Sequence, residues 1–154
     1  MTMQSGSRST ISRLDKFATK SANVLILIGR ILLAWVFVGS AYGAITNFSG
    51  SVGYFRSLNV PAPELFTTTA VALEVLMSAG LILGIATRYC AILVFLFVLI
   101  ATAIAHRYWE YPQAQQVAQY TNFLKNLAII GGLLLLFVYG AGRFSIDRML
   151  SRDR

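Results

Sequence analysis

Apolar residues fill four long stretches of the chain, and polar residues gather in the segments between them. The stretches cover residues 22–46, 63–86, 89–106 and 120–141. Each approaches or exceeds the roughly 20 residues that an α-helix needs to cross about 30 Å of hydrocarbon. Membrane strands would instead alternate apolar and polar residues over about ten positions. The pattern therefore predicts an all-α integral membrane protein, a four-helix bundle of transmembrane helices.

The connections between these stretches differ in length and character. The break at Thr87 and Arg88 is so short that the second and third helices must be antiparallel neighbours. Residues 47–63 mix apolar and polar side chains and predict a short helix lying in the outer interface. Residues 108–119 are aromatic and rich in Gln, which indicates an aromatic belt at the same interface.

Lysine and arginine are distributed unevenly, and this predicts the orientation. The two tails and the Thr87–Arg88 turn hold nine of them, against only Arg56 and Arg107 in the other two connections. The nine are Arg8, Arg13, Lys16, Lys20, Arg88, Arg143, Arg148, Arg152 and Arg154. Cytoplasmic loops carry the excess of positive charge. We therefore expect basic cytoplasmic tails, residues 1–21 and 143–154, on either side of a membrane domain of residues 22–142.

Composition narrows the possible functions. Hydrophobic residues make up 56% of the chain and charged residues 12%, with a net charge of +7. Because the basic residues flank apolar spans and form no stripe, the expected partner is the lipid bilayer and no nucleic acid. The lone Cys90 allows no intramolecular disulfide, so a redox role would need a bound cofactor or a partner protein. Glu74 and His106 are too few to predict a metal site.

Small residues at helical spacing predict close helix packing. Gly39 and Gly43, Gly80 and Gly84, and Ala128 and Gly132 are each four residues apart. Such pairs let helix backbones approach closely in a membrane. We expect them to serve packing within the chain, with oligomerisation through the GxxxG faces as the alternative.

Four ionisable residues fall within the spans or at their ends: Arg30, Glu74, His106 and Lys125. A charge at the bilayer centre costs at least about 2.5–3.5 kcal/mol, so such groups usually face the bundle and find partners. At about 1.5 Å rise per residue, Glu74 lies vertically between Arg30 and Lys125. We therefore expect these three side chains to meet in the bundle interior, and His106 to share the level of Lys125.

Two interpretations of this polar cluster stay open. An Arg–Glu or Glu–Lys pair can simply fix how the helices pack, His106 can sit among lipid headgroups, and Lys125 can extend its side chain towards them. Alternatively, the excess of cations over the single carboxylate would be met by an anionic or carbonyl-bearing ligand. The second interpretation makes the cluster a ligand or proton site.

Short motifs along the chain resemble the DoxX family. They are Gly29-Arg30 with the apolar residues that follow, Pro61-Ala-Pro63, Glu74, the segment 80–88, and the segments 123–134 and 140–147. The resemblance covers about residues 24–148 and implies a four-helix protein of the bacterial inner membrane. It also implies that Arg30, Glu74, His106, Lys125 and Asn126 occupy the family's characteristic polar positions. Many relatives carry a Lys near the outer end of the first span, where this chain has Ala44.

The resemblance and the residues together leave two functional hypotheses. Some members of the family resemble the small membrane subunit of a thiosulfate:quinone oxidoreductase, and others are linked to oxidative-stress complexes. In the first hypothesis the chain is a quinone-binding subunit that needs a redox partner. Arg30, Lys125 and Asn126 then bind the ligand, and Glu74 and His106 are the catalytic acid–base pair. In the second, the chain is a non-enzymatic membrane adapter whose basic tails dock peripheral proteins or anionic lipid.

Overall fold

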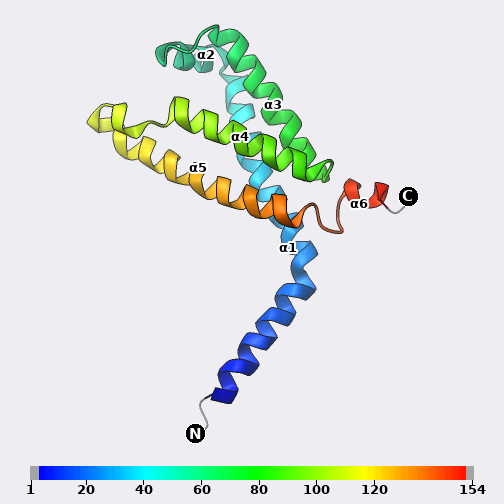
Figure 1. The fold of residues 1–154 in the computed structure, drawn as a ribbon. Coiled ribbons are helices and arrows are strands. Elements are labelled where there is room, and N and C mark those ends of the chain that lie inside the picture. The colour runs from blue at the N-terminus through cyan, green and yellow to red at the C-terminus, as the bar shows by residue number, and fades with distance from the viewer. Residues whose placement is uncertain (1–3, 152–154) are drawn as a thin grey trace.

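The computed structural model describes residues 4–151, with side chains from Ser12 onward, and every regular element in that range is helical (Figure 1). The elements are α1 (Gln4–Thr46), α2 (Phe48–Ser57), α3 (Pro63–Leu83), α4 (Thr87–Ala105), the 3-10 turn η1 (Tyr108–Glu110), α5 (Gln113–Tyr139) and α6 (Ile146–Leu150). Of the residues that predicted the orientation, the side chain of Arg8 and all of Arg152 and Arg154 lie outside the described part.

Four of these helices are long and apolar enough to cross a membrane, which confirms the predicted architecture. The membrane segments are Ser12–Thr46, Pro63–Leu83, Thr87–Glu110 and Gln113–Tyr139. The short helix expected in residues 47–63 is present as α2, capped at its start by the Asn47 side chain. Helix α1 continues without a break through residue 21, so the N-terminal basic segment is described as part of a helix from Gln4.

Two helix ends differ from the sequence prediction. Helix α3 stops at Leu83, three residues early, because Gly84 adopts a left-handed conformation with φ 68° and ends the helix. Helix α5 begins at Gln113, seven residues early, directly after Pro112. The extra turns are polar, so hydropathy alone does not find them.

The four long helices form two antiparallel pairs that separate towards one end (Figure 1). Helix α1 packs along α3, and α4 packs along α5. The pairs meet at the end that carries the α3–α4 turn and α6, called here the terminal end. There α5 reaches α1, and a Cβ added to Gly132 would lie 3.2 Å from Leu33 Cδ2. At the opposite end, called the α2 end, the pairs diverge and α2 lies beside the opening.

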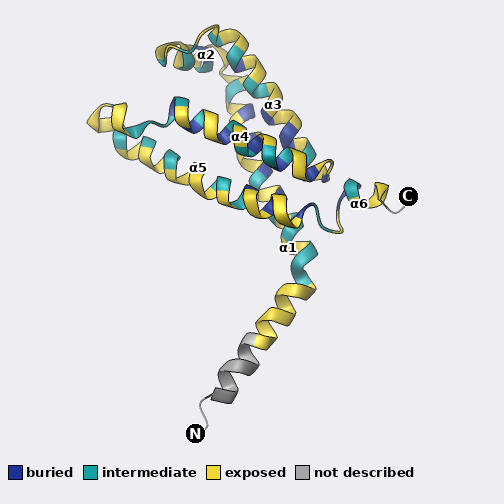
Figure 2. Ribbon diagram, in the orientation of Figure 1, coloured by how far each residue is buried: buried dark blue, intermediate teal, exposed yellow. Residues whose placement is uncertain are grey.

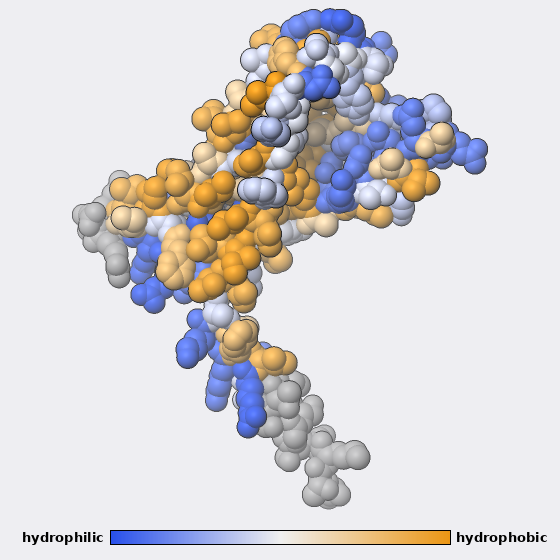
Figure 3. Space-filling view, turned by 180° about the vertical axis from the view of Figure 1, so that it is seen from behind, coloured by the Kyte–Doolittle hydropathy of each residue, from blue (hydrophilic) through white to orange (hydrophobic). Residues whose placement is uncertain are grey.

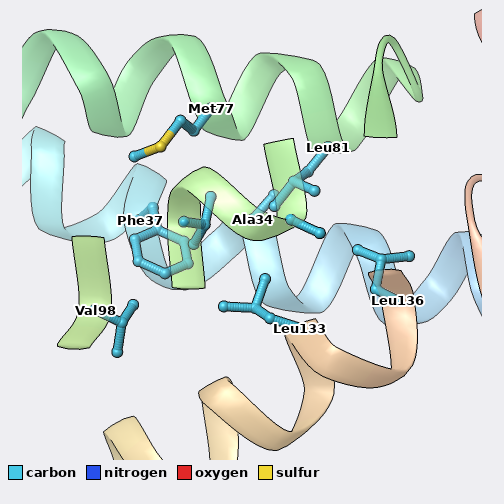
Figure 4. Close-up of a cluster of buried hydrophobic side chains, with 9 residues drawn as sticks. Ala34, Phe37, Met77, Leu81, Val98, Leu133 and Leu136 are labelled. Atoms are coloured by element: carbon cyan, nitrogen blue, oxygen red, sulfur yellow. The ribbon is translucent and has the colours of Figure 1, made fainter. Parts of the chain in front are cut away.

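Buried side chains concentrate near the terminal end, where all four helices approach one another (Figure 2). The core joins residues from all four, as Figure 4 shows: Ala34, Phe37, Met77, Leu81, Val98, Leu133 and Leu136. Phe37 and Phe97 meet edge to face, with ring centroids 6.4 Å apart. This core fills the interior of the bundle near the terminal end, and the space between the helix pairs lies towards the α2 end.

The small-residue pairs do not all act as predicted. The prediction that they pack within the chain is wrong for Gly39 and Gly43, because a Cβ at either position would meet nothing within 4 Å. It is confirmed for Gly80, where a Cβ would lie 2.5 Å from Cys90 Sγ. Cys90 fills that contact and its thiol donates to the Ile85 carbonyl oxygen at 3.4 Å. The thiol is therefore a packing group in this fold.

Candidate functional site

The space between the diverging helix pairs forms a cavity of about 620 Å³. Helices α1, α3 and α4 form its walls, and α2 covers it at the α2 end. Apolar and aromatic side chains dominate the lining, among them Phe55, Phe66 and Phe97. The polar lining residues are Ser40, Asn47, Ser51, Tyr54, Thr67, Glu74 and His106, with Thr69 at the edge. This combination suits a largely apolar molecule that carries a few polar groups.

Glu74 lies at the floor of the cavity, where the deepest lining residues of the three helices come together. Its side chain is 7% exposed, and Ser40 donates to its Oε1 at 2.8 Å. No other hydrogen bond or ion pair of this carboxyl group occurs in the described residues. A buried carboxyl group with a single partner retains unused acceptor capacity. Glu74 can therefore accept a hydrogen bond from a molecule in the cavity.

Two tyrosines tie α2 to the end of α4 across the α2 end of the cavity. The hydroxyl groups of Tyr54 and Tyr111 both donate to the Ala105 carbonyl oxygen, at 3.1 and 3.0 Å, and lie 3.2 Å from each other. Burial, together with the neighbouring Tyr111 hydroxyl, raises the pKa of Tyr54 above its ordinary value. The Tyr54 hydroxyl is therefore a neutral donor, and the tyrosine pair holds α2 in place as a cover.

His106 lines the cavity close to this cover. Its Nδ1 lies 2.8 Å from Gln119 Oε1 on α5, which fixes the orientation of the ring. Measured from the α3–α4 turn by helical rise, His106 is roughly 15 Å farther along than Glu74. The structure therefore brings both predicted catalytic residues to one cavity, but at its two ends. They cannot act directly on the same atom.

The edge of the cavity that opens between α3 and α4 is apolar. Leu73 on α3 and Ile100 on α4 both line the cavity, and both are exposed, at 42% and 57%. Figure 3, seen from behind, shows the molecule hollowed between its α2 end and the outer part of α4 and α5, with apolar side chains at the back of the hollow and hydrophilic ones along its α4–α5 side. These two exposed apolar side chains offer a molecule dissolved in the bilayer an apolar contact at the edge of the cavity.

Arg30 serves a different part of the fold. It is 1% exposed and donates to the carbonyl oxygens of Ala141, Ile82 at 3.1 Å and Phe144 at 2.9 Å. These carbonyls belong to the last turn of α3 and to the segment after α5, where helix ends leave acceptors unpaired. Arg30 thereby clamps the terminal end of the bundle and does not line the cavity.

The prediction that Arg30, Glu74 and Lys125 meet in the interior is wrong. Glu74 is level with Ser40, ten residues and about 15 Å along α1 from Arg30. Lys125 is exposed, because α5 turns its neighbour Asn126 towards α4, where the amide donates to Thr102 Oγ1 at 2.8 Å. Lys125 and Asn126 do not line the cavity, and whether they contact a ligand stays a prediction.

Sequence reasoning missed several residues that complete the cavity or brace the terminal end. Ser40 holds Glu74, but a serine in a helix can also bond its own backbone, so it gives no clear signal. Tyr54 and Tyr111 were expected only as interfacial residues, because their shared partner is a backbone carbonyl. Asp147 caps the start of α4 by accepting from Ala86 N at 2.7 Å and Thr87 N at 2.9 Å. A carboxylate near the end of a basic tail gives no hint of that role.

Comparisons with known proteins agree with the fold. The DoxX family model matches residues 25–107, a range that contains every residue lining the cavity. The inner membrane protein YphA of Escherichia coli is 36% identical over 81% of this chain and 89% of its own length. The inner membrane protein YqjF of the same organism is 32% identical over 86% of this chain and 97% of its own. A Surfeit locus protein 4 homolog of Schizosaccharomyces pombe is 27% identical over 79% of this chain but 36% of its own length. No solved structure matches.

Proposed function

Because the chain belongs to the DoxX family and is an inner membrane protein, we propose that its cavity binds a quinone as part of a membrane redox complex. The observation that carries the proposal is a single buried carboxyl group, Glu74, at the floor of a mainly apolar cavity that is open towards lipid. A quinone has a flat, uncharged ring with oxygen atoms on its edge and an apolar tail. The ring fits beside Glu74 and Phe97, and the tail fits the apolar opening at Leu73 and Ile100.

The charge of the lining favours a neutral ligand. Glu74 is the carboxylate of the cavity and Ala44 stands where many relatives carry a lysine, so His106 is the one lining residue able to become a cation. An anionic headgroup at the floor would be repelled by Glu74 when that group is ionised. A quinol hydroxyl would instead donate to it.

Glu74 can act as the proton acceptor for a quinol. A quinol that becomes a quinone loses two electrons and two protons. One phenolic proton passes to the Glu74 carboxylate, and the second leaves to water at the α2 end, where His106 stands. The two electrons pass to a flavin, haem or iron–sulfur centre of a partner protein. The protein thus supplies binding and proton transfer, and the partner supplies the electron acceptor.

Binding of a short-tailed quinone to the purified full-length protein tests the proposal. Losing a hydrogen bond to a charged group costs about 1.5–3 kcal/mol, so Glu74→Gln should weaken binding of the quinol form roughly tenfold or more. The matched control is Glu64→Gln, which removes a carboxylate from the same helix where Glu64 is exposed and paired with Arg56. Equal affinity of the wild type and both variants for quinone and quinol would contradict the proposal.

The membrane adapter is the second candidate, and one observation favours it. Helix α1 projects from the bundle at the terminal end, and along it Leu14 and Phe17 are exposed beside Arg13, Lys16 and Lys20 (Figure 1). An amphipathic basic helix of this kind is typical of a docking segment. An adapter would lose its partner when residues 12–20 are exchanged for a polar uncharged helix, and would keep it after Glu74→Gln. The quinone proposal expects Glu74→Gln to weaken ligand binding and the exchange of residues 12–20 to leave ligand binding unchanged.

We further propose that the terminal end faces the cytoplasm. Arg56 and Arg107 at the α2 end are each paired with a carboxylate, Glu64 at 2.5 Å and Glu110 at 3.2 Å. The basic residues of the terminal end form no ion pair within the described part of the chain. The positive-inside rule counts lysines and arginines near the ends of the spans, and their excess at the terminal end supports a cytoplasmic position for that end.

A further inference from the structure

Three basic side chains converge on a second cavity, far from the one described above. Lys20 on α1, Arg143 after α5 and Arg148 in α6 line a surface cavity of about 440 Å³ at the terminal end. Asn23, Val24 and Phe144 complete its lining, and no acidic residue contributes. The lining therefore carries a charge of +3, and no carboxylate in it neutralises that charge.

The backbone that carries these cations is firmly held. Arg30 donates to the carbonyl oxygen of Phe144, and the Asn23 side chain accepts from Arg143 N at 2.9 Å. Ser145 caps α6 by accepting from Arg148 N at 3.3 Å. Asp147, next to Arg148, is fixed to the start of α4. Arg143 and Arg148 thus project from a braced segment, so little ordering is needed when a ligand binds.

The position of the cavity relative to the membrane identifies its ligand. Val24 and Phe144 are both apolar, exposed and part of the lining, and Val24 stands near the start of the apolar span of α1. Lys20 lies one helical turn before Val24, on the polar side of that boundary. The cavity therefore lies where hydrocarbon meets headgroups, with cations at the level of the phosphates.

We propose that this cavity binds the phosphate headgroup of an anionic phospholipid in the leaflet at the terminal end. Arginine and lysine donate to phosphate oxygens, and basic pockets between membrane helices are suited to anionic lipid headgroups. The apolar side chains of Val24 and Phe144 lie against the start of the acyl chains. A neighbouring cavity that shares Arg148 is not part of the site, because the Asp147 carboxylate lines it and opposes an anion.

Lipid titration of the purified full-length protein tests the proposal, with binding of phosphatidylglycerol and phosphatidylcholine counted by native mass spectrometry. The wild type should prefer phosphatidylglycerol. Each cation near an anionic surface contributes roughly a fivefold gain in affinity, so Arg143→Gln with Arg148→Gln should weaken phosphatidylglycerol binding about 25-fold. Phosphatidylcholine binding should not change.

The matched control is Arg13→Gln with Lys16→Gln, which removes the same charge from α1 outside the cavity. An equal loss in this control would overturn the proposal, because attraction would then follow net charge and not the site. If the glutamine pair fails to fold, Arg143→Lys with Arg148→Lys should fold and keep most of the preference; loss of the preference in that folded variant would also overturn it.

Inorganic phosphate distinguishes the two sources of the same chemical group. The lipid proposal expects that phosphate ions at the concentration of the lipid phosphate neither raise the melting temperature nor displace bound phosphatidylglycerol. Stabilisation by inorganic phosphate, without any preference between the two lipids, would assign the site to a soluble anion and contradict the lipid assignment.

Discussion

Arg30 is a buried cation that bonds backbone carbonyls and forms no ion pair within the described residues. Replacing it with methionine would leave buried carbonyls of the α3 end and the post-α5 segment unpaired. We expect Arg30→Met to lower the free energy of unfolding by about 2–5 kcal/mol, since hydrogen bonds to charged groups are worth about 1.5–3 kcal/mol each. The free energies of unfolding of the wild type and of Arg30→Met, measured in mixed micelles, check this prediction.

Arg88 provides the comparison for Arg30. It is exposed and donates to one carbonyl, that of Val138 at 3.2 Å. Arg88→Met should therefore cost about 1 kcal/mol or less. Equal losses of unfolding free energy in the two variants would show that Arg30 stabilises the fold no more than an exposed arginine does.

Tyr54 allows a prediction about pH. Its pKa in the folded protein is raised, chiefly by burial, so the neutral hydroxyl is favoured by folding. The stability that it contributes is complete below the unfolded pKa near 10 and is lost as the pH rises above that value. We expect the melting temperature of the wild type to fall more steeply above about pH 10 than that of Tyr54→Phe. Parallel curves would show that the hydroxyl pair does not hold α2 in place.

At the residue scale, the sequence predicted which groups are buried better than which groups meet. Arg30 and Glu74 face inward as their helix faces indicated, because apolar and small neighbours at helical spacing define that side. Their partners could not be predicted. Those partners are backbone carbonyls for Arg30 and a serine hydroxyl for Glu74, and both depend on how far the helices slide past one another.

At the scale of the helices, Gly84 links the end of α3 to the Arg30 clamp. Its φ of 68° is strained for any other residue, and a Cβ there would lie 2.7 Å from Arg30 Nη1 and 2.5 Å from Ser145 Cβ. Gly84→Ala should therefore destabilise the protein by about 2 kcal/mol or more, through strain and displacement of the clamp. The melting temperature in detergent checks this.

Gly131 is the matched control on a straight stretch of α5. A Cβ at that position would meet nothing within 4 Å. Gly131→Ala should be neutral or slightly stabilising, because alanine favours a helix interior. A larger loss in Gly131→Ala than in Gly84→Ala would contradict the role given to the Gly84 turn.

The helices themselves were predictable because a bilayer admits few alternatives. A continuous apolar run of sufficient length must form a helix to satisfy its backbone. The ends were less predictable: polar turns such as the start of α5 have no hydropathy signal, and the end of α3 is set by one glycine. The divergence of the two helix pairs had no sequence signal, because it depends on which faces pack against each other.

At the scale of the whole molecule, the orientation can be tested independently of any ligand. Cysteine introduced at Ser151, at the terminal end, and at Ser57, at the α2 end, should respond differently to a membrane-impermeant thiol reagent in intact cells. We expect labelling at Ser57 and protection at Ser151, with Cys90→Ser as the background. The reverse pattern would contradict a cytoplasmic terminal end and move the proposed phospholipid site to the other leaflet.

The divergence of the helix pairs also creates the cavity of about 620 Å³ between them. The core at the terminal end closes one half, and the tyrosine pair with α2 covers the other, so the quinone proposal places ligand access at the exposed apolar lining residues of α3 and α4. This arrangement and the position of Glu74 support the proposal of a bilayer-soluble ligand with a polar ring.

The most direct test is to extract the protein gently from its own membrane and identify the small molecules that it releases, for the wild type, Glu74→Gln and Glu64→Gln. We expect a quinone or quinol to be released by the wild type and by Glu64→Gln, and to be depleted in Glu74→Gln. Phospholipid as the sole released molecule in all three, with the protein folded, would contradict quinone binding in the cavity.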